Sequence, residues 1–323
     1  MTDALGLPPL GLGTAGIGNL YRPVTDAQAE ALLDSAWDAG IRYFDTAPFY
    51  GLGRAEARLG RFLSGRREPV LVSTKVGRVL EPVDLDHVPE VGFAEPLPFA
   101  PRFDYSRDGL LRSFDDSVGR LGRVPDLLLI HDIGEMTHGT EGNAVHMAAL
   151  RTGGFRALDE LRSSGVRGIG IGVNEVAIGL ALLEEVRLDA ILLAGRHTLL
   201  DRSAGPLLRR AEAAGVAVIA AGVFNSGILA TGARPDAKFD YAPASRDILD
   251  RVAGMERVAA RHEAPLSALA LQFPRRDPAV RTTLLGAASA GELAVSLADL
   301  ERPVPTGAWD DLDAFTSTQK RAQ

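Results

Sequence analysis

The chain has 323 residues, of which 46% are hydrophobic and 24% are charged, as in folded globular proteins, so a wholly disordered chain is excluded. Its 35 Lys and Arg against 42 Asp and Glu give a net charge of −7, which disfavours nucleic-acid binding through a basic face. It contains no cysteine, and this excludes disulfides, thiolate metal sites and cysteine nucleophiles.

The sequence shows no targeting or membrane signal. The segment MTDALGLPPL at its start has neither the basic beginning nor the apolar stretch of a secretory signal, and no run of about 18 apolar residues occurs along the chain. We therefore expect a cytoplasmic protein that binds neither membranes nor nucleic acid.

Short apolar runs alternate with amphipathic segments along the whole chain. The runs rich in Val, Ile and Leu predict strands at 10–13, 41–45, 70–75, 127–131, 168–173, 190–193, 216–221 and 282–285. Segments with helical spacing follow them at 26–39, 54–64, 107–121, 155–164, 175–186, 204–214, 246–262 and 289–299. Repeated strand–helix pairs without a break in composition predict an α/β fold, a (β/α)₈ TIM barrel with a single domain over residues 1–323.

A doubly wound dinucleotide-binding fold is the alternative. It requires a G-x-G-x-x-G motif that opens a helix, whereas Gly11, Gly13, Gly16 and Gly18 precede a polar stretch. The longest insertion, 76–105, carries several prolines and follows the third strand, which places it on the catalytic face of a barrel. Loops of this length are usually functional or disordered.

Polar residues end three consecutive predicted strands. Asp45, Lys75 and His131 stand at these ends, and Tyr50 lies five residues beyond Asp45. Taken singly, the aspartate could cap a helix, the histidine could belong to the core, and the lysine could form an ordinary ion pair. Because the carboxyl ends of barrel strands meet at one face, the set together predicts a catalytic site.

These four side chains are suited to proton transfer. A tyrosine with its ordinary pKa of about 10 is a poor acid or base near neutral pH, but an ammonium within about 4 to 6 Å lowers that pKa. We expect Lys75 to act on Tyr50 in this way, with Asp45 orienting the ammonium and His131 donating a hydrogen bond to a substrate oxygen. The site would serve a carbonyl or carbinol oxygen without a metal or a covalent nucleophile.

The same residues carry a resemblance to a known family. The run from Asp45 to Gly51, with Glu56, Leu59 and Gly60, Lys75 in Ser-Thr-Lys and His131 in Leu-Ile-His-Asp, strongly resembles the signature of the aldo-keto reductase superfamily, and the likeness extends over essentially the whole chain. It implies a (β/α)₈ barrel, an extended nicotinamide cofactor, Tyr50 as general acid/base, Lys75 and Asp45 as its tuning pair, and His131 as the substrate-oxygen ligand.

Segments 194–201 and 220–227 are similar to the branch of aldose 1-dehydrogenases, which includes L-fucose and L-galactose dehydrogenases, and of pyridoxal 4-dehydrogenase. The cofactor-binding residues that the resemblance implies are Gly13, Thr14, Asp45, Asn174, Gly222, Phe224, Asn225, Ser226, Gly227, Gly286, Ser289 and Glu292. The implied substrate-binding residues are Tyr21, Phe49, Tyr50 and His131.

Two positions depart from the family pattern. Ala194 and Ala221 stand where many relatives have a glutamine that holds the nicotinamide amide and an aromatic ring that stacks on it. Arg196, His197 and Phe224 are the candidates to replace these groups, and Phe224 could equally be a packing residue at the barrel rim.

The second phosphate segment bears on the choice of cofactor. NADP-preferring relatives commonly have an Arg or Lys where Ala288 stands, to pair with the 2′-phosphate. Its absence, together with Glu292 as an acceptor for adenine or ribose, favours NAD over NADP.

The leading hypothesis is a dehydrogenase that oxidises the anomeric carbinol of an aldose such as L-fucose, L-galactose or D-arabinose to the lactone. The alternatives are a pyridoxal 4-dehydrogenase giving 4-pyridoxolactone, a general aldehyde or ketone reductase, a lyase with a Schiff base on Lys75, and a non-catalytic nicotinamide-sensing subunit. The histidines lack metal-binding spacing, so no metal is expected. The oligomeric state stays open.

Overall fold

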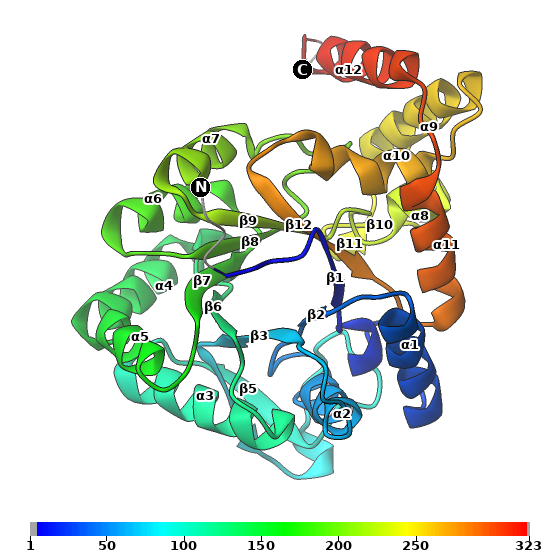
Figure 1. Ribbon diagram of the computed structural model, residues 1–323. Helices are drawn as coiled ribbons and strands as arrows, with labels where there is room; N and C mark the ends of the chain where they lie inside the picture. The colour runs from blue at the N-terminus through cyan, green and yellow to red at the C-terminus, as the bar shows by residue number, and fades with distance from the viewer. Residues whose placement is uncertain (1–4, 322–323) are drawn as a thin grey trace.

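The apolar runs form parallel strands that hydrogen-bond to their neighbours and close into a barrel (Figure 1). The computed structural model describes residues 5–321, with side chains to residue 317. The barrel strands are β1 (Leu10–Gly13), β2 (Tyr43–Asp45), β3 (Leu71–Val76), β6 (Leu127–His131), β7 (Gly168–Val173), β8 (Ala190–Ala194), β9 (Ala217–Ala221) and β12 (Val280–Gly286). Leu12 of β1 pairs with Leu285 on one side and Phe44 on the other, which closes the barrel. The predicted (β/α)₈ TIM barrel is therefore confirmed.

The predicted helices surround the barrel within a few residues of their expected bounds. They are α1 (Asp26–Asp38), α2 (Arg54–Leu63), α3 (Arg107–Leu121), α5 (Phe155–Arg162), α6 (Val176–Glu185), α7 (Gly205–Ala214), α9 (Arg246–Arg261) and α11 (Ala290–Glu301). Several begin where the sequence offers a capping side chain: the hydroxyls of Thr25, Ser106, Ser245 and Ser289 each accept the backbone N–H three residues on.

Other helices were not predicted. They are α4 (Glu135–Ala149), α8 (Ile228–Thr231), α10 (Leu266–Gln272) and α12 (Thr306–Arg321), with the 3₁₀ turns η1 (Gly16–Gly18), η2 (Leu85–His87) and η4 (Phe273–Arg276) and the π-turn η3 (Leu150–Gly154). Helix α4 is polar and bends at Gly139, which has φ +66°, so it lacks the apolar stripe of a barrel helix. Helix α12 packs against α9 outside the ring of barrel helices (Figure 1). In the described part of the chain, no helix is long and apolar enough to cross a membrane.

The long insertion after β3 is not a structureless loop. Strands β4 (Arg78–Pro82) and β5 (Phe99–Phe103) form an antiparallel hairpin within it, so of the two alternatives expected for a loop of this length, disorder does not apply. A second, shorter hairpin of β10 (Lys238–Phe239) and β11 (Ala242–Pro243) lies in the long connection after β9.

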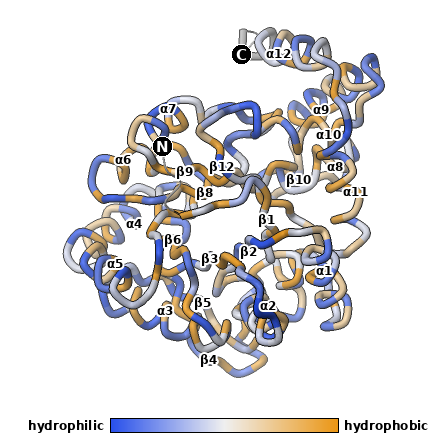
Figure 2. The backbone as a smooth tube through the Cα atoms, viewed as in Figure 1, coloured by the Kyte–Doolittle hydropathy of each residue, from blue (hydrophilic) through white to orange (hydrophobic). Residues whose placement is uncertain are grey.

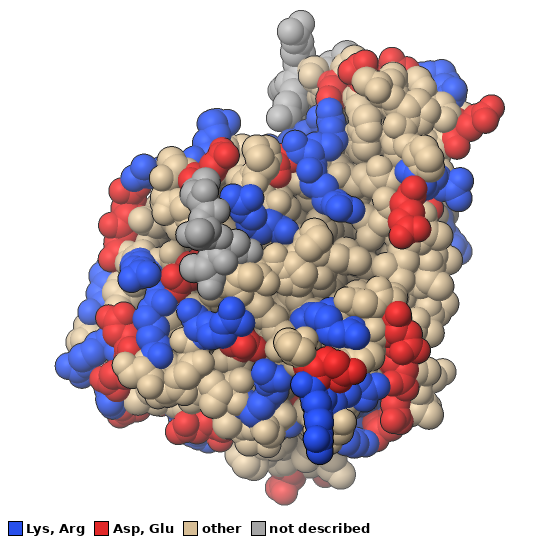
Figure 3. Space-filling model, viewed as in Figure 1, with Lys and Arg blue, Asp and Glu red and all other residues tan. Residues whose placement is uncertain are grey.

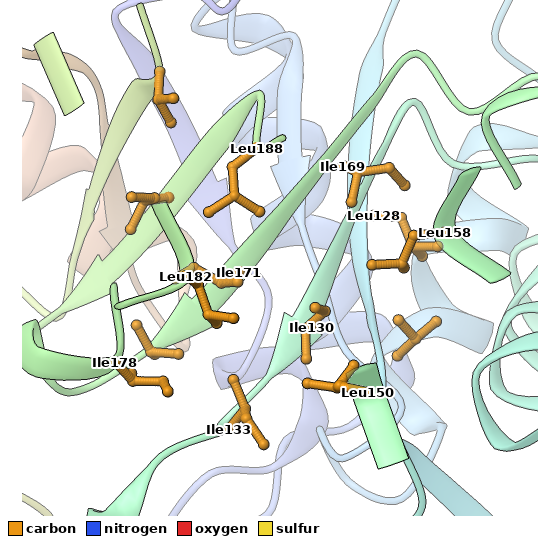
Figure 4. Close-up of a cluster of buried hydrophobic side chains, with 14 of the residues drawn as sticks. Leu128, Ile130, Ile133, Leu150, Leu158, Ile169, Ile171, Ile178, Leu182 and Leu188 are labelled. Atoms are coloured by element: carbon orange, nitrogen blue, oxygen red, sulfur yellow. The ribbon is translucent and has the colours of Figure 1, made fainter. Parts of the chain in front are cut away.

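Strand β7 shows how the barrel is filled. Its Ile169 and Ile171 turn outward into a core shared with the helices (Figure 4), while its alternate glycines face the barrel interior. Figure 2 shows apolar positions along the central strands and alternating polar and apolar positions on the helices around them. A Cβ on Gly170 would lie 2.2 Å from the Ala190 carbonyl oxygen, and a Cβ on Gly172 would lie 3.2 Å from Cε of Lys75. The glycines on the inner face of β7 therefore leave space for the Lys75 side chain.

We expect Gly170→Ala to lower the free energy of unfolding by about 1 to 3 kcal/mol, because the added methyl group meets backbone rather than a flexible side chain. Urea unfolding followed by circular dichroism measures this. Gly119→Ala is the matched control: this glycine is exposed within α3 and its Cβ would meet nothing within 4 Å, so the variant should be as stable as the wild type or more so. A Gly170→Ala protein that unfolds at the wild-type urea concentration would contradict this packing.

Candidate active site

Three neighbouring barrel strands bring their polar ends together at the mouth of the barrel, the opening formed by the carboxyl ends of the strands. Strands β2, β3 and β6 are adjacent in the barrel, and they carry Asp45, Lys75 and His131. All three side chains are buried, with exposures of 2%, 1% and 5%. Tyr50 lies in the turn between β2 and α2 and is half-buried at the same mouth. The four residues singled out in the sequence therefore lie together.

Lys75 and Asp45 form a buried ion pair. The Lys75 ammonium donates to Asp45 Oδ1 at 2.8 Å and to the Thr46 carbonyl oxygen at 2.9 Å. The second carboxylate oxygen of Asp45 accepts from the Ser73 hydroxyl at 2.6 Å. Burial works to lower the pKa of Lys75, but Asp45 and Tyr50 outweigh it and raise this pKa to about 12. Lys75 is therefore charged at any physiological pH.

Close glycine contacts hold Tyr50 in place. A Cβ on Gly18 would lie 2.8 Å from the Tyr50 carbonyl carbon, and a Cβ on Gly51 would lie 2.4 Å from the Gly18 carbonyl oxygen. Gly51 also has φ +64°, a conformation that favours glycine. The Lys75 ammonium lies 4.9 Å from the centre of the Tyr50 ring. The backbone around the phenol is thus packed directly against the loop that follows β1.

Lys75 lowers the pKa of Tyr50 as expected, but it does not decide the net direction of the shift. Burial is the largest effect and raises the pKa of Tyr50 above its ordinary 10, although the charge and hydrogen bond of Lys75 lower it. The carboxylates of Asp45 and Asp132 add to the rise. The Tyr50 hydroxyl is consequently protonated at neutral pH, which suits it to donate a proton to an oxygen. To take a proton from a carbinol, Tyr50 must be in its phenolate form, which becomes more populated as the pH rises.

His131 is a neutral hydrogen-bonding group. Burial, followed by the nearby charges of Arg78 and Lys75, holds its pKa well below 6.5. Its Nδ1 is buried without a hydrogen-bond partner, and its ring packs edge-to-face against Tyr50 at 6.2 Å between ring centres. A neutral imidazole beside the phenol carries an N–H that can donate to a substrate oxygen.

Sequence reasoning missed part of the wall on this side of the mouth. Arg78 forms an ion pair with Asp132, and its guanidinium lies 3.9 Å from the centre of the Phe49 ring. Phe93 of the long insertion packs edge-to-face on Phe49 at 5.5 Å and lies 6.1 Å from Tyr50. One indication of this wall was present in the sequence: Asp132 directly follows His131 and so had to lie at the same strand end. The expected substrate residue Phe49 is therefore part of an aromatic wall.

The turn after β9 contains several residues in left-handed backbone conformations. Gly222, Asn225, Ser226 and Gly227 have positive φ angles of 60°, 45°, 58° and 97°. Left-handed residues arrange backbone N–H groups into a concave nest that binds phosphates, and non-glycine residues in this region are strained. The N–H groups of Asn225 and Gly227 donate to the carbonyl oxygens of Gly222 and Phe224, and the Asn225 side chain donates to the Gly195 carbonyl oxygen at 3.1 Å. Binding of a dinucleotide pyrophosphate by this turn therefore stays a prediction.

Residues at the ends of β1 and β12 complete this half of the mouth. Gly13 pairs with Gly286 and with Asp45 in the barrel register. Thr14 donates its N–H to the Asp45 carbonyl oxygen at 2.9 Å, and its hydroxyl is buried without a partner. The unpartnered hydroxyl next to the ion pair is a further group that fits a bound cofactor.

Glu292 has polar partners at its predicted place after β12. Its carboxylate forms an exposed ion pair with Arg22 and accepts the Ala288 N–H at 2.8 Å, and acceptance from adenine or ribose stays a prediction. Ser289 caps α11, its hydroxyl accepting the Glu292 N–H at 3.2 Å. The loop after β12 is therefore a capped helix start tied by an exposed ion pair to the loop after β1.

The candidates to replace the missing glutamine and aromatic ring are held by other contacts. Arg196 donates to the Asn174 carbonyl oxygen at 2.6 Å and pairs with Asp240 at 2.9 Å. His197 packs against Phe273 with ring centres 5.0 Å apart, and Phe224 is half-buried between two hydrophobic clusters. These contacts favour packing and positioning roles for all three side chains.

Among residues 5–321, no three His, Cys, Asp or Glu side chains lie close enough to form a metal site. On the face seen in Figure 3, Lys and Arg are interspersed with Asp and Glu.

Comparisons with known proteins agree with this geometry. The sequence model of the Aldo/keto reductase family matches residues 9–317. Pyridoxal 4-dehydrogenase of Microbacterium luteolum is 45% identical over 315 residues, covering 94% of this chain and 92% of that protein. D-threo-aldose 1-dehydrogenase of a Pseudomonas species is 36% identical over 322 residues, covering 95% of this chain and 94% of that protein.

Solved structures show the same fold. An aldo-keto reductase of Bacillus halodurans in its holo form matches with a TM-score of 0.73 at 22% identity, covering 96% of this chain and 92% of that one. The glycerol dehydrogenase of Gluconobacter oxydans matches with a TM-score of 0.72 at 21% identity, covering 97% and 92%.

The depressed pKa of His131 predicts a pH-dependent stability. The His131 imidazole is neutral in the folded chain but protonates near pH 6.5 in the unfolded chain. Its contribution to the free energy of unfolding is therefore complete above pH 6.5 and is lost as the pH falls below that value. We expect His131→Gln to reduce the slope of unfolding free energy against pH between 6.5 and 5.5 by about 1 kcal/mol per pH unit. The exposed His87→Gln is the control. Equal slopes for wild type and His131→Gln in urea unfolding would refute the assigned state of His131.

Proposed function

The chain belongs to the aldo/keto reductase family and is an NAD(P)-dependent oxidoreductase, and we propose that it oxidises a cyclic hemiacetal to the corresponding lactone. The observation that carries the proposal is the buried Lys75–Asp45 pair set beside the phenol of Tyr50 and the neutral imidazole of His131. These groups can bind one oxygen and move one proton, which is what oxidation of a carbinol requires of the protein.

In the proposed reaction, His131 binds the anomeric hydroxyl oxygen of the substrate, and Tyr50 in its phenolate form takes the hydroxyl proton. Lys75 stabilises the phenolate, while Asp45, Ser73 and the Thr46 carbonyl hold the ammonium in place. The anomeric carbon loses its hydrogen as hydride and becomes the lactone carbonyl carbon. The nicotinamide cofactor, when bound, supplies the hydride acceptor. Because the pKa of Tyr50 is raised, oxidation is faster at alkaline pH.

Two observations favour pyridoxal over an aldose as this substrate. The chain is 45% identical to a pyridoxal 4-dehydrogenase and 36% identical to a D-threo-aldose 1-dehydrogenase, each over most of its length. The rings of Phe49 and Phe93 also form an aromatic wall beside Tyr50, which suits a flat pyridine ring. Oxidation of an aldose to its lactone, the leading hypothesis from sequence, remains the second candidate and uses the same residues.

The geometry disfavours a Schiff-base lyase. A lysine must lose its proton to attack a carbonyl carbon. Lys75 has a pKa of about 12 and is hydrogen-bonded to Asp45 and Thr46, so its amine is neither free nor nucleophilic. The same ion pair instead stabilises charge on the neighbouring phenol.

NAD is the proposed cofactor. Asn174 and the turn from Gly222 to Gly227 would hold its nicotinamide and pyrophosphate ends. Ala288 offers no cation for a 2′-phosphate, and the nearby Arg22 is paired with Glu292. We propose that NADP is used less efficiently for this reason.

We expect Tyr50→Phe to lower kcat by about 100-fold or more, because it removes the group that accepts the proton. Its Kd for NAD should change less than about twofold, since the hydroxyl lies among the proton-transfer groups and carries no charge at neutral pH to pair with a cofactor phosphate. Tyr43→Phe is the control: it removes a fully buried phenolic hydroxyl, bonded to Ser73 at 2.9 Å, and should keep kcat within about tenfold of wild type. Wild-type kcat in Tyr50→Phe would disprove the proposed mechanism.

A substrate panel separates the two candidates. Pyridoxal, L-fucose, L-galactose and D-arabinose are each incubated with NAD and with NADP, and formation of the reduced cofactor is followed by absorbance. We expect the highest kcat/KM for pyridoxal with NAD, and lactone as the product. A preference for one of the sugars would select the second candidate, and turnover of none of them would contradict the hemiacetal class.

Cofactor choice is tested at position 288. We expect Ala288→Arg to tighten NADP binding by about tenfold through a charge-assisted contact with the 2′-phosphate. Ala288→Met adds length without charge and should not do so. Isothermal titration with each cofactor measures the effect, and an equal gain in both variants would show that charge is not the cause.

A further inference from the structure

A buried cation at the mouth takes no part in the proposed proton transfer. Arg78 begins β4 and is 8% exposed, and its guanidinium lies 3.9 Å from the centre of the Phe49 ring and 4.6 Å from that of Phe103. A guanidinium that packs on aromatic rings keeps its N–H edge for hydrogen-bond acceptors. The backbone is constrained as well, because Gly77 has φ +99° and its Cβ would lie 2.5 Å from the Tyr105 ring. Arg78 is therefore held in one place.

Arg78 meets a carboxylate directly after β6. It forms an ion pair with Asp132, whose N–H donates to the Gly172 carbonyl oxygen at 2.9 Å. Asp132 has φ +49°, a left-handed conformation that is strained for a non-glycine residue and is concentrated at functional sites. Its Oδ2 atom also lies 3.5 Å from Nε2 of His131. The strained residue thus brings a carboxylate beside the imidazole that is proposed to bind the anomeric oxygen.

The Asp132 carboxylate has capacity for a further hydrogen bond. Among the described residues, its contacts with Arg78 and His131 both use Oδ2, which leaves Oδ1 to accept from a bound molecule. Burial raises the pKa of Asp132, while the charges of Arg78 and Lys75 oppose this rise and favour the carboxylate form. A carboxylate accepts hydrogen bonds and donates none, so its partner must be a donor such as a hydroxyl group.

Attachment of the β4–β5 hairpin to the barrel does not by itself account for this ion pair. The Tyr105 hydroxyl, just after β5, already joins the hairpin to β6 by donating to the His131 carbonyl oxygen at 2.7 Å. Burying two charges costs desolvation energy, and apolar residues of similar size are often equally stabilising or more so. The pair is better explained by what it can bind at the mouth.

We propose that Asp132 determines substrate specificity: its carboxylate accepts a hydrogen bond from a hydroxyl group close to the anomeric carbon, and Arg78 holds that carboxylate in place. Because His131 Nε2 and Asp132 Oδ2 are 3.5 Å apart, a substrate bound through its anomeric oxygen brings a nearby hydroxyl within reach of the carboxylate. An aldose carries such a group at position 2, and pyridoxal carries one at position 3. The inference rests on the proposed function, because it assumes that His131 binds the anomeric oxygen.

Pairs of substrates that differ only in this hydroxyl test the proposal on the wild-type enzyme. D-arabinose is compared with 2-deoxy-D-ribose, which lacks its 2-hydroxyl, and pyridoxal is compared with 3-deoxypyridoxal. For the pair that is turned over faster, we expect kcat/KM to be about 10- to 100-fold higher with the hydroxyl present, the effect of one hydrogen bond to a charged group. Equal values for the two members would overturn the inference.

The variant Asp132→Ala tests whether this residue causes the preference. It should lower kcat/KM for the hydroxyl-bearing substrate by about 10- to 100-fold and change that for the deoxy substrate by less than about threefold. An equal loss on both substrates, as from a structural role, or an unchanged preference would each contradict the proposal. Glu81→Ala is the matched control, because Glu81 pairs with Arg102 in an exposed part of the same hairpin, and it should keep the wild-type preference.

Asp132→Asn keeps the test decisive if Asp132→Ala does not fold. Its amide has the shape of the carboxylate but accepts only a neutral hydrogen bond, so the preference should fall to about 2- to 10-fold. A full wild-type preference in Asp132→Asn would refute the assigned role of the charge. If the wild-type protein oxidises neither member of either pair with NAD or NADP, it is the proposed function that fails, so the two failures are distinguishable.

Discussion

The buried ion pair between Lys75 and Asp45 is the contact around which the mouth of the barrel is organised. Desolvating each charge costs on the order of several kcal/mol, so such a pair persists where its remaining polar atoms are also satisfied. Ser73, Thr46 and, through Ser73, Tyr43 satisfy them here. The glycines of β7 are part of the same arrangement, because the lysine stem occupies the space where a side chain on Gly172 would lie.

The two halves of the mouth are built differently. On the side of β2, β3 and β6, the reacting groups project from barrel strands or from a turn packed against Gly18, and their positions follow from the barrel itself. On the side of β7, β8 and β9, long loops meet through Arg196 and Ser226. The first half places the proton-transfer groups, while the second half holds the residues proposed for cofactor binding.

The fold and the reacting residues could be predicted because both depend on local patterns. A polar residue that ends an apolar run, such as Asp45 or His131, marks the carboxyl end of a barrel strand directly in the sequence. Helix α4 was missed because its glycines and polar residues conceal any apolar stripe. Prolines likewise concealed the β4–β5 hairpin. The raised pKa of Tyr50 could not be foreseen, because spacing reveals a neighbouring ammonium but not the extent of burial. Phe93 reaches the site through contacts between segments far apart in sequence.

The contact between Gly18 and Gly51 has a consequence for altering this protein. Since backbone meets backbone there, the phenol cannot be shifted sideways without rebuilding the first loop of the barrel. New substrate preferences are therefore better sought by changing side chains of the aromatic wall, such as Phe93, than by moving Tyr50.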